Sequence, residues 1–404
     1  MPEQIIERRY RLLLIATHPV QYSAPSFREM ARNPRLDIEV AYCSLQGAEA
    51  GVDKDFGVEV KWDVPLLDGY SWTQEPNRAR HPSLDHFFGL VNTGLWSKIH
   101  KGRYDAVVIY TGYRVASFWI ALSAAKFSRT PVLFGTDATS LAPRSGTPWK
   151  AKVKKWLWPI FFRMADQVLV PSTTSRELLQ SIGVPADRIS MTPYSVDNSW
   201  WRAQAAWVNR THVRTEWNVP SSAVVILFCA KLQRWKRPND LLRAFAKANS
   251  PNSFLICAGD GPLLQDLKRD AAMLAVEDRV RFLGFVNQSQ LPSLYKSSDL
   301  FVLPSEYEPF GVVVNEAMLC GCAVAVSDRV GAGRDLVRAE NGFVYPCGDI
   351  EALAALIRLA VTDPAKLQQM GAASERIIQT WSLHENTEAL IGALDRIYRR
   401  RANG

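Results

Sequence analysis

The chain has 404 residues, of which 47% are hydrophobic and 22% are charged. These fractions match soluble globular domains and exclude bulk disorder, collagen and one long coiled coil. No apolar run reaches the ~18–20 residues that a membrane-spanning helix needs. The formal net charge of +8 favours an anionic partner. At about 100–200 residues per domain, the length predicts two or three domains.

The first apolar stretch, residues 12–16, is shorter than the ~7–15 residues of a secretory signal core, so it is expected to be a buried strand. The six cysteines are sparse, and the C-x-C of Cys320 and Cys322 has no second pair to complete a zinc site. These features favour a cytoplasmic protein.

Short apolar strands alternate with helical windows along the first half, which predicts a parallel sheet covered on both faces. The expected strands are 12–16, 38–42, 106–110, 132–134, 168–170 and 188–192, and the expected helices include 115–127 and 175–182. Residues 193–218 show no clean periodicity and are expected to contain the domain boundary.

The same alternation then begins again. Its expected strands are 224–229, 254–257, 281–283, 300–303 and 323–326, with helices at 238–248 and 262–274. Two doubly wound domains are therefore predicted, 1–200 and 201–381. A final helix at about 382–401 is expected to pack back on the first domain. Ligands of such sheets bind at the carboxyl ends of the strands, so the cleft between domains is the expected site.

A basic turn follows the first strand of the second half. Lys231, Arg234, Lys236 and Arg237 lie within seven residues, between that strand and the next helix. Cations at this position suit a diphosphate leaving group, whose charge grows as its bond breaks. An ordinary solvated turn is the alternative.

Two glutamates, Glu308 and Glu316, stand eight residues apart in a strand–loop–helix–strand pattern. A helix beginning near Gly311 would point its unpaired first-turn amides at an anion, such as a pyrophosphate. The carboxylates could then accept hydrogen bonds from a sugar and a ribose on either side. A surface loop residue and a helix ion pair are the alternative interpretation.

Glycines also follow strands in Ala258-Gly-Asp-Gly-Pro and Phe282-Leu-Gly-Phe-Val. Glycine lets a backbone approach a ligand closely, although turn glycines need no ligand.

Taken together in this order, these segments resemble the retaining glycosyltransferases of family 4, which have the GT-B fold of two facing Rossmann-like domains. The matching stretches are 231–238, 258–263, 280–286, 298–305, 308–325, 331–335 and 341–349.

The resemblance implies roles for residues of the second half. Glu308 would contact the donor sugar and Glu316 the ribose, while Lys231 and Lys236 would grip the diphosphate. Lys231 stands where the family more often has arginine, so the charge remains but the planar bidentate fork does not. The implied donor-binding residues are Lys231, Lys236, Phe285, Val286, Glu308, Pro309, Phe310, Gly311, Val312 and Glu316.

The first half resembles the family more weakly. His18 follows the first strand where relatives often have a glycine-rich loop, and it is either a site residue or a structural histidine. Thr136 stands where a histidine is common. We therefore expect the neighbouring Asp137 to be a polar contact for the acceptor.

Two further segments offer other chemistry. Asp53-Lys-Asp is a D-x-D motif, which binds a divalent metal in another glycosyltransferase fold. The lysines already supply countercharge, so we predict no metal and no cofactor.

Residues 148–163 combine cations with three tryptophans, which is typical of a helix on an anionic membrane surface. A helix covering the first domain is the alternative.

The sequence thus predicts transfer of a sugar, with retention, from a nucleotide diphosphate sugar to an acceptor hydroxyl. A UDP-sugar is slightly favoured, and the acceptor could be a sugar or a lipid-linked sugar of cell-surface polysaccharide or glycolipid synthesis. The protein would be cytoplasmic, peripheral on the membrane, and would not bind nucleic acid. Alternatives are a phosphorylase or synthase on this fold, and a non-catalytic nucleotide-sugar or nucleic-acid binding protein.

Overall fold

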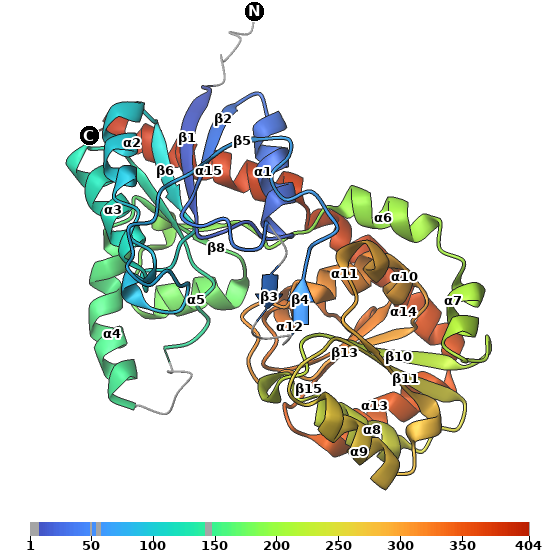
Figure 1. Cartoon of the computed structure of the whole chain (residues 1–404). Helices are drawn as coiled ribbons and strands as arrows, with labels where there is room; N and C mark the ends of the chain where they lie inside the picture. Colours follow the sequence, from blue (N-terminus) through green and yellow to red (C-terminus); the bar gives the residue numbers. More distant parts are fainter. Residues whose placement is uncertain (1–7, 49–50, 54–57, 142–147, 404) are drawn as a thin grey trace, which may run out of the picture. The chain divides into compact units, whose positions relative to one another are not determined.

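The computed structural model describes residues 8–48, 51–53, 58–141 and 148–403, and only the backbone of 51–53, 58–60 and 148–153 (Figure 1). The chain forms two compact units. The first contains Met1–Glu49, Pro65–Pro193 and Leu383–Gly404, and the second contains Ala50–Val64 and Tyr194–Ser382. The chain therefore crosses from one unit to the other four times. The division after Pro193 differs from the expected boundary at residue 200, and the short segment 50–64 belongs to the second unit.

The first unit is built on a parallel sheet with strand order β5-β2-β1-β6-β7-β8-β9 among the described residues (Figure 1). The strands are β1 (Tyr10–Ala16), β2 (Leu36–Tyr42), β5 (Ser71–Gln74), β6 (Ala106–Ile109), β7 (Val132–Gly135), β8 (Gln167–Val170) and β9 (Ile189–Met191). The helices are α1 (Ser23–Arg32), α2 (Gly94–Gly102), α3 (Ala116–Phe127), α4 (Pro148–Arg163), α5 (Thr173–Ser181) and α15 (Leu383–Asn403), with 3-10 turns η1 (Phe87–Gly89) and η2 (Ala186–Arg188).

Alternate residues of β1 enter two different cores of this unit. Leu13 and Ile15 pack with α2, α3, α4 and α5, whereas Leu12 and Leu14 pack with α1 and α15. Alternation across a strand puts successive side chains on opposite faces, so a strand that is apolar throughout must be covered on both. The carboxyl-terminal helix α15 supplies part of that cover.

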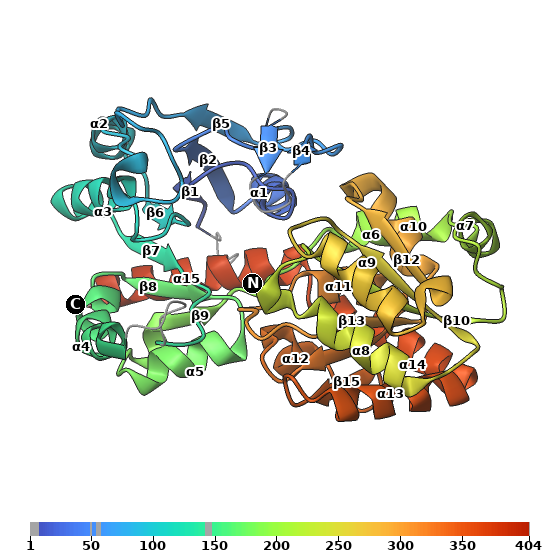
Figure 2. The ribbon, with the colours of Figure 1, turned by 60° about the horizontal axis from the view of Figure 1, so that its bottom comes forward.

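The second unit has a parallel sheet with strand order β12-β11-β10-β13-β14-β15 within the described chain (Figure 2). The strands are β10 (Val224–Cys229), β11 (Ser253–Ala258), β12 (Val280–Gly284), β13 (Leu300–Leu303), β14 (Ala323–Ser327) and β15 (Gly342–Tyr345), with a separate antiparallel pair, β3 (Gly51–Asp53) and β4 (Val58–Val60). The helices are α6 (Asn198–Ala206), α7 (Arg210–Glu216), α8 (Pro238–Ala248), α9 (Leu264–Met273), α10 (Leu291–Lys296), α11 (Val313–Leu319), α12 (Gly331–Leu336), α13 (Ile350–Thr362) and α14 (Pro364–Ile377), with turns η3 (Arg234–Lys236), η4 (Glu277–Arg279), η5 (Gln288–Gln290) and η6 (Ile378–Thr380).

Two parallel, doubly wound sheets confirm the predicted fold class. Every strand expected from the sequence is present, with ends that differ by at most two residues. The sequence analysis missed β5 and β15, which are edge strands with partly exposed side chains and hence a weak apolar signal. It also missed α6 and α7 in the stretch 193–218.

Candidate functional site

The strand order of the second unit fixes where its ligand site should lie. Numbered along the unit, the order is 3-2-1-4-5-6, so the connections leaving β10 and β13 turn in opposite directions. Ligands of open α/β sheets bind beyond the carboxyl ends of the strands at this switch point. Lys231 and Lys236 follow β10, and Glu308 follows β13. The sequence-predicted residues therefore flank the switch point.

Lys236 and Glu308 form an ion pair, Lys236 Nζ with Glu308 Oε2. Their side chains are only 17% and 14% exposed, so water screens the charges poorly. The main chain connects the same two loops, because the Glu306 amide donates to the carbonyl of Trp235 at 2.8 Å. A cation and a carboxylate that are far apart in the sequence thus meet at one edge of the sheet.

The loops after β10, β11 and β12 are hydrogen-bonded to one another at this edge. The Ala230 amide donates to Ala258 at 3.1 Å, and the Gly259 amide donates to the Gly284 carbonyl at 2.7 Å. Gly259 has a φ of +129°, and a Cβ there would lie 2.0 Å from the Ala230 carbonyl oxygen. This glycine is therefore required by loop packing, which is the ligand-free interpretation of the motif.

The loop carrying Glu308 is clamped against the start of α12. Glu308 and Val330 form an isolated parallel β-bridge, and the Gly331 amide donates to the Glu308 carbonyl at 3.0 Å. Gly311 has a φ of +94°, which favours glycine at the turn. Helix α11 begins at Val313, two residues later than Gly311, where the sequence analysis expected it.

The predicted donor-binding residues of this loop divide into buried and accessible groups. Phe310 is 1% exposed and stacks on Trp381, with ring centroids 5.9 Å apart, so its ring is part of the core. Pro309 and Val312 are half-buried. Any contact of Phe310 with a ligand must therefore use its main chain.

Glu316 is a buried acid, 8% exposed, with two hydrogen-bonding side chains beside it. Tyr295 donates its hydroxyl to Glu316 Oε2 at 2.9 Å, and Gln288 is the other partner. Burial raises the pKa of Glu316 to about 7, although the hydrogen bonds from Tyr295 and Gln288 lower it. The sequence analysis missed these two partners, which carry no motif of their own.

The basic turn does not act as one cluster. Arg237 pairs with Asp240 at 2.6 Å and with Glu306 at 3.0 Å, while Arg234 is exposed. Arg237 is therefore paired with carboxylates of its own, whereas Lys236 pairs with Glu308; Lys231, Lys236 and Arg237 are all half-buried.

The first unit has its own switch point, between β1 and β6. His18 follows β1 and Thr111 follows β6. His18 Nδ1 and Thr111 Oγ1 are buried with no hydrogen-bond partner among the described residues. Burial lowers the pKa of His18, so its imidazole is neutral near pH 7. Buried polar atoms normally have partners, so this pair is open to a polar ligand.

Asp137 follows β7 in the same unit, where it is exposed and interacts with Tyr22. Burial and the negative charge of Asp137 both raise the pKa of the Tyr22 phenol. Asp137, Tyr22 and His18 thus provide one carboxylate, one neutral phenol and one neutral imidazole in the loops of the first unit.

The D-x-D motif, metal binding and membrane crossing were also considered from the sequence. The D-x-D motif lies outside the described residues, apart from the backbone of Asp53. Within the described part of the chain, no group of three or more His, Cys, Asp or Glu residues could hold a metal ion. No described helix is long and apolar enough to cross a membrane.

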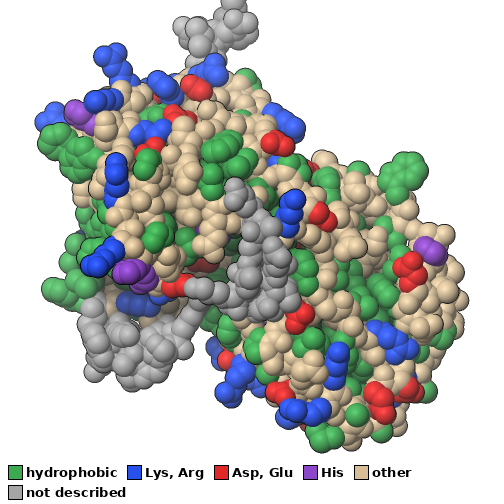
Figure 3. All heavy atoms as spheres, in the orientation of Figure 1, with side chains coloured by type: hydrophobic (Ala, Val, Ile, Leu, Met, Phe, Trp, Pro, Cys, Tyr) green, Lys and Arg blue, Asp and Glu red, His purple; other side chains and the backbone are tan. Residues whose placement is uncertain are grey.

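Helix α4 corresponds to the basic aromatic stretch 148–163. Trp158 and Phe162 are buried against α3 and the sheet, whereas Trp156 is 73% and Ile160 56% exposed. Figure 3 shows hydrophobic side chains alongside lysines and arginines on the α3–α4 edge of the first unit. One face of α4 thus covers the domain and the other presents aromatic and aliphatic side chains to solvent.

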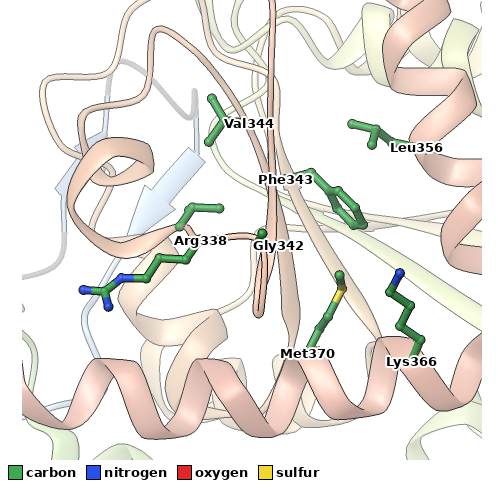
Figure 4. Close-up of a pocket in the computed structure, with 9 residues that line it drawn as sticks. Arg338, Gly342, Phe343, Val344, Leu356, Lys366 and Met370 are labelled. Atoms are coloured by element: carbon green, nitrogen blue, oxygen red, sulfur yellow. The ribbon is translucent and has the colours of Figure 1, made fainter.

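A cavity of about 420 Å³ lies elsewhere in the second unit, beside the edge strand β15. Figure 4 shows Met370 and Lys366 of α14 directed toward Phe343 of β15 and Leu356 of α13. Its lining contains none of the residues at the sheet's switch point. This cavity is therefore separate from the candidate site, which consists of the charged residues and loops at the switch point.

Known proteins resemble both halves of the chain. Residues 18–195 match the family described as "Glycosyl transferase 4-like domain", and residues 209–377 match "Glycosyl transferases group 1". A glycosyltransferase of Methanocaldococcus jannaschii is 37% identical over 185 residues, 45% of this chain and 47% of that protein. D-inositol 3-phosphate glycosyltransferase of Rhodococcus jostii is 28% identical over 234 residues, 55% of this chain and 51% of that protein. The matched region therefore spans about half the length of these curated relatives.

Solved structures are similar over nearly the whole chain. The structure of Anabaena HepE in complex with UDP and glucose has a TM-score of 0.72 at 20% identity, covering 96% of this chain and 100% of that one. A glycosyltransferase from Rickettsia africae has a TM-score of 0.75 at 16% identity, covering 96% and 99%. These similarities confirm the GT-B fold. The two family matches and this fold together show that the chain belongs to the family 4-type, or group 1, glycosyltransferases.

Proposed function

We propose that the protein transfers a sugar from a nucleotide diphosphate sugar to an acceptor hydroxyl, with retention at the anomeric carbon. The observation that carries this proposal is the Lys236–Glu308 pair at the switch point of the second unit. A cation for the leaving group and a carboxylate for the sugar are both needed there. The Anabaena HepE structures with UDP, glucose and UDP-glucose support a UDP-sugar as donor.

In the proposed reaction the bond between the anomeric carbon and the diphosphate oxygen breaks as the acceptor hydroxyl attacks the same face. The departing phosphate oxygen takes the hydroxyl proton. Lys231 and Lys236, with the amides near Gly311, stabilise the negative charge that grows on the diphosphate. When the donor binds, before this step, Glu308 exchanges its ion pair for hydrogen bonds with the sugar hydroxyls, and Glu316 accepts hydrogen bonds from the ribose.

The first unit binds the acceptor in this proposal. His18 and Thr111 carry buried polar atoms that lack partners within the described residues, and Asp137 adds a carboxylate. Sugar hydroxyls both donate and accept hydrogen bonds, so they suit this mixture of groups. The lysines supply the countercharge for the diphosphate, so the proposed reaction needs no metal ion.

We further propose that the acceptor lies at an anionic membrane surface on the cytoplasmic side, as for a lipid-linked sugar. The exposed side chains of Trp156, Leu157 and Ile160 lie next to Lys154 and Lys155 on α4. Aromatic and aliphatic groups can enter the interface while lysines contact acidic headgroups. The aromatic contacts extend to Trp119 through Phe161, whose ring centroid lies 5.7 Å from that of Trp119.

A thermal-shift screen tests the donor directly. UDP, GDP, ADP and their glucose conjugates are added to the full chain, with inorganic phosphate as a control. We expect one nucleotide and its sugar to raise the melting temperature, because a ligand that binds only the folded state stabilises it by mass action. If no nucleotide raises it, the proposal is wrong.

A second measurement separates transfer from phosphorolysis. The donor identified by the screen is incubated with candidate acceptors, and free nucleoside diphosphate is quantified. A transferase releases nucleoside diphosphate with each transfer, whereas a phosphorylase consumes inorganic phosphate and releases a sugar phosphate. Addition of EDTA should leave the rate of nucleotide release unchanged. Loss of that rate, restored by a divalent metal, would contradict metal independence.

A further inference from the structure

A short segment from the first half of the sequence packs on the second unit at the loop after β12. We call residues 61–63 the strap. The strap follows β4 and lies within the part of the chain, Ala50–Val64, that belongs to the second unit. The loop it touches, residues 285–289, includes Phe285 and Val286, two of the donor-binding residues that the family resemblance implies, and we assign this loop to the nucleobase of the donor.

The strap holds both ends of this loop. At its start, the ring of Trp62 meets Phe285 edge to face, with centroids 6.2 Å apart. At its end, Asn287 Nδ2 donates to the Lys61 carbonyl at 2.7 Å, and the Ser289 amide donates to Asp63 Oδ1 at 3.1 Å. The Ser289 hydroxyl also hydrogen-bonds to the Asp63 carboxylate.

Asp63 therefore acts as a cap supplied from a distant part of the sequence. Ser289 lies in the first turn of the helical segment formed by η5 and α10. The first amides of such a segment lack partners within it, and a carboxylate that accepts from them is favourable in hydrogen bonding and in charge. The Asn287 side chain caps the preceding amide, that of Gln288, at 2.9 Å, so Asn287 and Asp63 together satisfy the first two amides of this segment.

The same segment holds Glu316. Gln288 belongs to η5 and Tyr295 to α10, and both are hydrogen-bonding partners of the Glu316 carboxylate. Three contacts of the strap lie on Phe285, Asn287 and Ser289, so Gln288 is held between two anchored neighbours. A substitution in the strap should consequently alter both the conformation of loop 285–289 and the position of Gln288 beside Glu316, the proposed ribose-binding residue.

We propose that the strap is a positioning element of the donor-nucleotide site, and that Trp62 and Asp63 set the affinity for the nucleoside part of the donor. This inference rests on the proposed function. The strap holds loop 285–289 in the conformation that receives the base, and it orients Gln288 toward Glu316. The diphosphate contacts, Lys231 and Lys236, lie on the loop after β10, which none of the strap contacts given above touches.

The test compares nucleotide and pyrophosphate binding in strap variants of the full chain. Trp62→Ala and Asp63→Ala are prepared with two controls from the second unit, Trp207→Ala, whose ring is 89% exposed, and Asp278→Ala, whose side chain is 77% exposed. Calorimetry measures the Kd of the nucleoside diphosphate that stabilises the wild type most, and of inorganic pyrophosphate. Thermal unfolding verifies that each variant is folded.

We expect each strap variant to weaken nucleoside diphosphate binding by about tenfold, because a smaller fraction of molecules has the loop in the binding conformation. Pyrophosphate binding should stay within about twofold of the wild type, and both controls should bind nucleotide normally. A merely structural role would lower both affinities together or neither. Should a strap variant not fold, Trp62→Leu, which keeps an apolar side chain but loses the ring contact with Phe285, or Asp63→Asn, which loses the carboxylate that accepts from Ser289, takes its place and is expected to weaken nucleoside diphosphate binding several-fold while pyrophosphate binding is unchanged.

The outcomes separate the two proposals. A wild type that binds no nucleotide overturns the proposed function. A wild type that binds nucleotide, with strap variants that bind it equally well or lose pyrophosphate in parallel, overturns only the role of the strap.

Discussion

The ion pair between Lys236 and Glu308 shows what individual residues contribute to the site. Each charge is largely removed from water and each is compensated by the other. A buried charge without its partner is costly, so each member of the pair stabilises the other until a donor replaces the contacts. The site is thus charged before its substrate arrives.

Removing either member of this pair should reduce turnover strongly. We expect Glu308→Ala and Lys236→Ala each to lower the rate of nucleotide release by about 100-fold, the cost typical of losing one charged contact in a transition state. The double variant should lose less than the product of the two effects, since the residues contact each other. The exposed pair Lys247–Glu351 of the same unit provides the control: replacing either residue with alanine should leave the rate of nucleotide release unchanged.

Glu316 should make stability depend on pH. Its folded-state pKa is about 7 against an ordinary value of 4.5, so the folded protein holds this proton more tightly than the unfolded chain. The contribution to stability is therefore largest below pH 4.5 and falls as pH rises to 7, by on the order of 3 kcal/mol.

Glu316→Gln removes this titration but keeps a hydrogen-bonding side chain. The melting temperature of the variant minus that of the wild type should increase between pH 5 and pH 8. Glu340→Gln, at an exposed position of the same unit, should show no such increase. A constant difference across this range for Glu316→Gln would contradict the raised pKa.

The sequence predicted the positions of these residues better than their partners. Lys236 and Glu308 were expected at one site because each follows a strand of the same parallel sheet. Arg237 was expected to join them, but Asp240 and Glu306 are within reach of its guanidinium and bind it. Tyr295 and Gln288 could not be assigned, since the burial of Glu316 depends on how α10 packs.

At the scale of elements, the loops at the carboxyl edge are held by close backbone contacts. Gly331 is one such point, because a Cβ there would lie 2.1 Å from the Pro309 carbonyl oxygen. Its amide also holds Glu308 in place. The conformation of the loop 308–312 thus depends on the absence of a side chain at the start of α12.

Gly331→Ala should therefore impair the reaction while the unit stays folded. The added methyl group forces the loop 308–312 away from α12 and moves Glu308, so turnover should fall by about tenfold or more. The rate of nucleotide release and the far-ultraviolet circular dichroism measure the two effects. Gly392→Ala on α15 is the control, because its Cβ would meet only Arg396 at 3.6 Å and alanine favours a helix.

Interior strands and long helices were predictable because their apolar residues are continuous or periodic. The strap was not predictable, since its hydrogen bonds join residues 226 positions apart. Its sequence, Lys61-Trp-Asp, carries no periodic signal, and Asp63 caps a helical segment that the chain forms much later. Contacts of this kind become visible only when both segments are folded.

At the scale of the molecule, each unit supplies a different surface. The exposed face of α4 belongs to the first unit, and the charged switch point with Lys236 belongs to the second. If α4 meets lipid, then membrane binding and donor binding are separate properties that can be altered independently.

Vesicle co-sedimentation tests that separation. Binding to vesicles containing phosphatidylglycerol should fall several-fold in a Trp156→Ala, Ile160→Ala double variant, since each side chain loses apolar contact with the interface. Vesicles of phosphatidylcholine alone should bind the wild type weakly, and nucleotide affinity should not change. Trp207→Ala serves as the control for loss of an exposed tryptophan. Equal binding of the double variant and the wild type would contradict a membrane role of α4.

The return of α15 to the first unit has a consequence for biosynthesis. Leu390, Ile391, Leu394 and Ile397 complete the core against β1, and Asp395 receives a hydrogen bond from Tyr10 at 2.6 Å. The ribosome makes β1 long before α15, so the part of this face that α15 covers stays exposed until residues 383–403 have been synthesised. That part of the nascent sheet must consequently remain exposed, or be shielded by a chaperone, until the residues of α15 leave the exit tunnel.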